Sequence, residues 1–161
     1  MATVEELEQL GELIRLQVTL TPPDRDRRSI YFRPQAHRWL NETLPNITSF
    51  DPNDISPREQ MYALLYMFLT GETLDEGDEF RLMRPIEQDV YELKSVDLRI
   101  FGWFYRPAIF IATAVDTMER VHKYEGLSNG YRDEVIRVRG ATLLGPPAYL
   151  EGASISDVFS V

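Results

Sequence analysis

The chain has 161 residues, of which 43% are hydrophobic and 27% are charged, a composition typical of one globular domain. It has no cysteine, which excludes a disulfide framework and a zinc site built on thiolates. The net charge of −9 argues against a general nucleic-acid-binding protein, because phosphate contacts need clustered Lys and Arg. The sequence shows neither a signal peptide nor an apolar run that could cross a membrane, so we expect a cytoplasmic protein without a membrane partner.

The first 28 residues are expected to form a helix and a linker, outside the main domain. Residues 3–17 carry leucines at helical spacing, and Thr3 with Glu6 matches the capping-box pattern. The Pro-rich, charged segment 21–28 then breaks the helix. We expect this extra N-terminal helix either to pack outside a sheet or to mediate self-association as a homodimer.

Helical patterns dominate the next part of the chain. Residues 29–33 are typical of a short strand, and residues 34–44 of a short helix. Ser56 is a favourable cap for a helix over residues 57–70, and Gly71 is a plausible stop. This helix is apolar on most sides and is predicted to bury Met61, Leu64, Leu65, Phe68 and Leu69.

From residue 90 onwards the apolar pattern has a period of two. Residues 90–95 and 98–105 alternate around a tight turn, and residues 109–115 form a third, β-branched strand. Alternation around the turn pairs Lys94 with Arg99, and we expect both side chains to lie side by side on one exposed face of the sheet.

Strands that follow helices predict an α+β domain, with the N-terminal helices packed on a small antiparallel sheet. We place this domain at residues 29–140, with a further helix near its end. Residues 141–161 are rich in Gly, Pro and Ser, and we expect an irregular C-terminal tail.

Three motifs of the predicted sheet follow one another in an order and spacing that can be compared with a known family. They are Tyr91-Glu92-Leu93-Lys94, the sequence LRIF at residues 98–101, and IFIATAV at residues 109–115. Together they resemble the phage-derived, HigB-like branch of the RelE/HigB toxin superfamily, over roughly residues 29–126. The resemblance implies a RelE-like fold and a toxin of a toxin–antitoxin system, an endoribonuclease that cuts mRNA on the ribosome and is bound by an antitoxin. It implies no cofactor and no metal.

RNA cleavage without a metal needs a base, an acid and a cation that stabilises the charged transition state. The resemblance assigns Lys94 and Arg99 to basic positions on adjacent strands. It places Arg120, His122 and Lys123 at the exit of the third strand, and a histidine suits proton transfer near neutral pH. The same side chains also fit a solvated sheet face, on which Glu92 and Asp97 would be the partners of Lys94 and Arg99.

The sequence also departs from the family. Family members are typically basic and carry an adjacent pair of bases after the third strand, whereas residues 118–124 spread their bases and include Glu119. A second hypothesis is therefore a non-catalytic, acidic phage interaction protein on the same fold, such as an anti-CRISPR inhibitor. Its negative surface would bind a host nucleic-acid-binding complex. A structural or assembly protein of a phage or mobile element is a third alternative.

Overall fold

The computed structural model describes residues 1–52 and 54–161, and within them six strands form one sheet in the order β1-β2-β6-β5-β4-β3. The strands are β1 (Ile14–Arg15), β2 (Ser29–Phe32), β3 (Phe80–Leu82), β4 (Tyr91–Lys94), β5 (Leu98–Arg106) and β6 (Ile109–Thr117). The α+β class is confirmed. The sheet is larger than expected, and it is mixed rather than antiparallel, because β2 pairs with β6 in parallel.

The expected meander is confirmed in β4, β5 and β6, which pair antiparallel in chain order. The backbone N–H of Ser95 donates to the carbonyl of Leu98 at 3.1 Å and closes the turn between β4 and β5. Lys94 and Arg99 are therefore register partners, as the alternation predicted.

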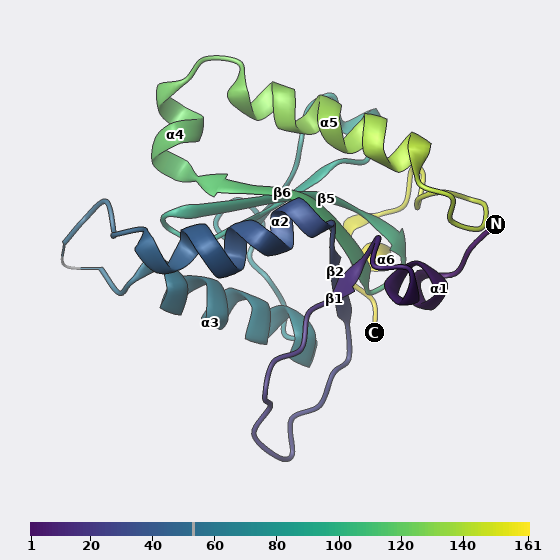
Figure 1. Ribbon diagram of the computed structural model, residues 1–161, viewed down its shortest axis with the longest axis horizontal. Coiled ribbons are helices and arrows are strands. Elements are labelled where there is room, and N and C mark those ends of the chain that lie inside the picture. The colour runs from purple at the N-terminus through teal and green to yellow at the C-terminus, as the bar shows by residue number, and fades with distance from the viewer. Residues whose placement is uncertain (53) are drawn as a thin grey trace.

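Helices cover both faces of the sheet. They are α1 (Val4–Gln9), α2 (Pro34–Arg38), α3 (Pro57–Thr70), α4 (Met118–Lys123), α5 (Leu127–Ala141) and α6 (Ile155–Val158). A π-helix (Trp39–Thr43) and a 3₁₀ turn (Leu44–Asn46) continue α2, and a second 3₁₀ turn spans Ile86–Gln88. Figure 1 shows α3 on one side of the sheet and α5 on the other. In the described ranges we find no helix with the length and apolar character that crossing a bilayer requires.

Helix α3 has the boundaries that its sequence predicted. The Ser56 side chain accepts a hydrogen bond from the Glu59 N–H at 3.2 Å, and Gly71 ends the helix in the left-handed conformation at φ 83°. The expected inward residues Met61, Leu64, Leu65, Phe68 and Leu69 are all buried. This helix supplies the core on its face of the sheet.

The N-terminal helix is shorter than the predicted range of residues 3–17. Its capping box between Thr3 and Glu6 is present, but the helix ends at Gln9. Gly11 has a φ of 75°, which reverses the chain and turns Leu13 into the core. The following residues then pair with β2 as a short edge strand. The helix predicted from the leucine spacing is therefore present over residues 4–9 and absent beyond them.

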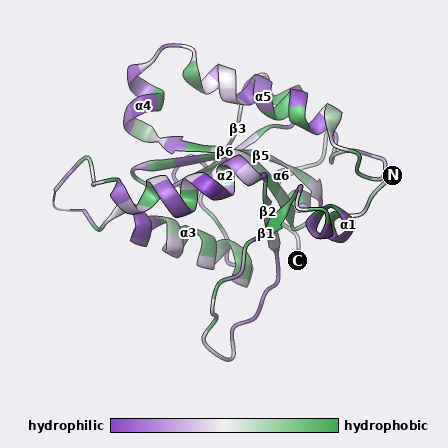
Figure 2. Ribbon diagram, in the orientation of Figure 1, coloured by the Kyte–Doolittle hydropathy of each residue, from purple (hydrophilic) through white to green (hydrophobic). Residues whose placement is uncertain are grey.

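Two apolar clusters lie on opposite faces of the sheet, and the chain termini complete them. Val4, Leu7 and Leu13 belong to the cluster on the α5 face. Residues 141–161 are largely irregular, as expected, but their end packs on the α3 face. The Phe159 ring centre lies 4.7 Å from that of Phe80 and 5.0 Å from that of Phe104. Figure 2 shows hydrophobic colouring on β2 and on parts of α3, and hydrophilic colouring at the end of β6 next to α4.

Candidate functional site

The structure brings together three of the five residues expected to cut RNA. Lys94 and Arg99 are partners across β4 and β5, and Arg99 is the partner of Asp116 across β5 and β6. The Asp116 carboxylate accepts a hydrogen bond from Arg120 Nε at 3.1 Å. Lys94, Arg99, Asp116 and Arg120 thus form a cross-strand row at the hydrophilic end of the sheet.

Arg99 does not lie on an exposed face, so this part of the prediction is wrong. Its residue surface is only 7% exposed, and its Nε lies 3.0 Å from an oxygen of Glu92, which is 2% exposed. Its guanidinium also donates to the backbone carbonyls of Ser95 and Leu98. Burial lowers the pKa of Arg99, and the charge of Glu92 opposes that shift. The side chain therefore folds back against its own hairpin instead of facing solvent.

Lys94 is half-buried under the acidic turn, which we define as residues 75–79. The Lys94 Nζ donates to the carbonyl of Gly77, and its backbone N–H donates to the carbonyl of Glu79 at 2.8 Å. Burial lowers the pKa of Lys94, and the nearby charge of Arg99 lowers it further. The acidic turn thus already binds the Lys94 ammonium through a backbone carbonyl.

Arg120 is held by a carboxylate that also binds a tyrosine. Asp116 is 4% exposed and accepts a hydrogen bond from the Tyr131 hydroxyl at 2.5 Å. The Tyr131 ring stacks on Phe101, with ring centres 4.8 Å apart. Burial and the hydrogen bond to Asp116 raise the pKa of Tyr131, and the same carboxylate raises the pKa of Arg120. These contacts tie β6 to α4 and α5.

His122 and Lys123 are exposed on α4 and stand outside the row. The Lys123 ammonium lies 5.6 Å from the ring centre of Tyr124. In the ranges that the structure describes, no hydrogen bond or ion pair joins His122 to the row. The same ranges contain no group of three His, Cys, Asp or Glu side chains that could hold a metal ion.

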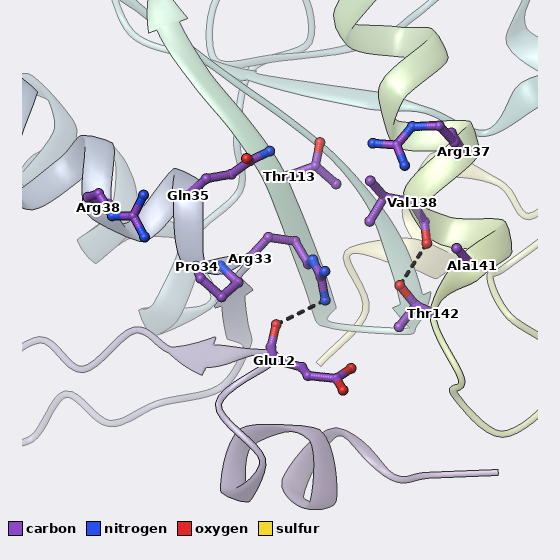
Figure 3. A pocket seen from close by; sticks show the side chains of 10 residues that line it. All are labelled: Glu12, Arg33, Pro34, Gln35, Arg38, Thr113, Arg137, Val138, Ala141 and Thr142. Carbon is purple, nitrogen blue, oxygen red and sulfur yellow. Dashed lines mark hydrogen bonds between the residues drawn. The ribbon is translucent and has the colours of Figure 1, made fainter.

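A second polar site lies on the same face of the sheet, beyond the Phe101 ring. It is a pocket of about 410 Å³ between the start of α2, strand β6 and the end of α5. Figure 3 shows its lining, and we call it the arginine pocket for three of its ten residues. The residues are Glu12, Arg33, Pro34, Gln35, Arg38, Thr113, Arg137, Val138, Ala141 and Thr142.

The residues of this pocket form no motif that the sequence alone reveals. Arg33 and Arg38 flank α2, but Arg137 lies in a distant segment of the chain, and no spacing rule joins it to them. One local signal was present, because a glycine inside a strand pattern indicates a bulge or a close backbone approach. Gly102 is such a glycine: a Cβ there would clash with the backbone carbonyl of Ile111, on the strand that forms the pocket floor.

Comparison with known proteins does not identify the chain. No protein-family model, no curated protein and no solved structure matches it. The resemblance to the RelE/HigB toxins therefore stays a prediction that rests on the motifs of β4, β5 and β6.

Proposed function

We propose that the chain is a non-catalytic interaction protein that keeps a toxin-like arrangement of strands. The observation that carries this proposal is the burial of Arg99 against Glu92. A cation that stabilises a phosphorane-like transition state must reach the phosphate. Arg99 is enclosed and already neutralised by a carboxylate, which supports a structural role for this residue.

The partner that fits best is a protein with a basic surface, such as a host complex that binds nucleic acid. The chain carries 26 acidic and 17 basic residues, and its acidic turn places exposed Asp75, Glu76 and Asp78 beside the hairpin of β4 and β5. A negative surface of this kind can occupy a site that is built for phosphate, and it also accelerates association with a basic partner.

A second candidate is the mRNA endonuclease that the family resemblance implies, with the ribosome and an antitoxin as partners. The observation that favours it is the register of Lys94 and Arg99, which places the two bases side by side on adjacent strands. This candidate requires Arg99 to leave Glu92 when the chain binds the ribosome.

An assay of mRNA cleavage distinguishes the two candidate functions. The purified chain is incubated with ribosomes carrying a defined mRNA, and the cut ends are mapped by primer extension. We expect intact mRNA and no growth arrest when the chain is expressed alone. Cleavage that a Lys94→Ala and Arg99→Ala double variant abolishes, with its fold preserved, would establish the endonuclease instead.

The interaction itself needs a positive test. We expect the chain to inhibit DNA cleavage by an RNA-guided nuclease of its host, since such enzymes present a basic nucleic-acid channel. Changing Glu76→Lys and Asp78→Lys should weaken the inhibition and its dependence on salt. Glu79 is a poor choice for reversal, because its carboxylate accepts the Asp75 N–H at 2.9 Å and shapes the turn.

A further inference from the structure

The arginine pocket combines a cavity, several cations and a specialised strand geometry. We infer that it binds a small organic anion that carries phosphate or carboxylate groups. This inference does not depend on the proposed function, because the pocket lies apart from both the cross-strand row and the acidic turn. Its volume of about 410 Å³ is within the usual range of small-molecule sites, about 300–1,000 Å³.

Two of the three arginines flank α2, and the third reaches the pocket from α5. Arg33 precedes α2, Arg38 ends α2, and Arg137 lies on α5. Arg33 donates to the backbone carbonyl of Glu12 at 3.1 Å, and no carboxylate among the described residues pairs with its charge. Within residues 1–52 and 54–161, Arg38 and Arg137 have neither a hydrogen-bond acceptor nor an ion-pair partner. Arginine is the side chain whose planar fork best matches carboxylate and phosphate oxygens.

The floor of the pocket is built by a β-bulge. Phe101 pairs with Ala114 and Gly102 pairs with Ala112, so Thr113 is an extra residue in β6. Thr113 is fully buried, and its hydroxyl reaches the Phe101 carbonyl at 3.4 Å. Bulges often re-aim a side chain beside a functional site. Gly102 permits the close approach of β5 and β6 next to this bulge.

Two polar side chains of the pocket, from α2 and α5, converge over its floor. In Figure 3, the Gln35 amide and the Arg137 guanidinium point toward one another across Thr113. Gln35 donates to a carboxylate oxygen of Glu134 at 3.0 Å, which holds its amide over the floor. The Arg137 guanidinium and the Gln35 amide can thus bind a ligand above the bulge, with Arg33 and Arg38 lining the same pocket.

The charges around the pocket favour an anionic ligand. Glu12 lines the pocket and Glu134 stands beside it, so three arginines face two carboxylates. The surplus of positive charge is unusual in a chain with a net charge of −9. The lining contains no aromatic ring on which a nucleobase could stack, so the recognised part is the anionic group itself.

Calorimetric titration of the full chain at low salt tests this inference, with pyrophosphate and citrate as separate probes. We expect saturable binding of at least one probe. Arg137→Ala and Arg38→Ala should each weaken that binding by about tenfold or more, as loss of a charge-assisted hydrogen bond does. Arg58→Ala is the matched control, because Arg58 is exposed on α3 and outside the pocket; it should leave the affinity unchanged.

The two probes separate the sources of the anion. Binding of pyrophosphate alone assigns the site to phosphorylated compounds, and binding of citrate alone assigns it to carboxylates. Arg137→Gln serves as a second variant if Arg137→Ala loses its native circular dichroism spectrum. Absence of saturable binding with both probes would overturn the inference, and so would an equal loss of affinity in Arg58→Ala.

Discussion

The cross-strand row and the arginine pocket lie on the same face of one sheet, but they differ in whether their arginines are paired with carboxylates. In the row, Arg99 is bound to Glu92 and Arg120 is bound to Asp116. In the pocket, Arg38 and Arg137 have no such partner within the described ranges, and Arg33 contacts only a backbone carbonyl. Basic residues on a sheet face therefore indicate a binding site only where the fold leaves their charge without an internal partner.

The largest difference between the two regions is expected in stability. Arg99→Ala leaves Glu92 buried with the exposed Arg81 as its one remaining ion-pair partner among the described residues. Removing one member of a buried pair typically costs about 3–5 kcal/mol. Arg137→Ala should change the free energy of unfolding by less than about 0.5 kcal/mol, since it removes an exposed side chain. Urea unfolding measures both values. If both variants lose a similarly small free energy of unfolding, Arg99 is no more important to the fold than Arg137.

A smaller effect is expected from Tyr131→Phe, which removes one donor from the buried Asp116. A hydrogen bond to a charged group contributes about 1.5–3 kcal/mol, so the variant should lose stability in that range. Tyr62→Phe is the control, because that hydroxyl is exposed and donates to the neutral Thr19 carbonyl at 3.3 Å. If the two variants unfold at the same urea concentration, Asp116 does not depend on Tyr131.

The smallest effect concerns the dependence of stability on pH. Burial lowers the pKa of Lys94 in the folded chain below its ordinary value of 10.5, so the unfolded chain holds the proton more tightly. As the pH rises from the folded pKa toward 10.5, the wild type should therefore gain stability relative to Lys94→Gln. The glutamine keeps an amide donor for the Gly77 carbonyl. Urea unfolding at each pH measures this difference in the free energy of unfolding between the two proteins. A difference that stays constant over this pH range would argue against burial of the ammonium.

Local rules predicted the parts of the fold that depend on neighbours in sequence. The capping residue Ser56 and the stop at Gly71 placed α3, and the period of two placed Lys94 opposite Arg99. The parallel pairing of β2 with β6 joins segments about eighty residues apart, and no local pattern specifies it. The predicted helix over residues 3–17 failed at Gly11, where the left-handed turn overrides the leucine spacing.

The candidate site was harder to predict than the fold, because burial depends on distant contacts. Alternation gave the face on which Arg99 lies but not its depth, which is set by Glu92 and the hairpin carbonyls. The position of Lys94 against Gly77 depends on how the acidic turn folds over β4. The arginine pocket forms only where α2, β6 and α5 meet in the folded chain. Gly102 in β5 was the one sequence signal of the bulge at its floor.

We infer that the guanidinium of Arg99 is bound within the fold, whereas that of Arg137 is available to a ligand. NMR of the arginine Nε–H groups measures this directly, through their exchange with water and their shifts when pyrophosphate or citrate is added. We predict a slowly exchanging Arg99 signal that does not move and a rapidly exchanging Arg137 signal that shifts with saturation. A rapidly exchanging Arg99 signal that shifts with the added anion, beside an unchanged Arg137 signal, would contradict the claim.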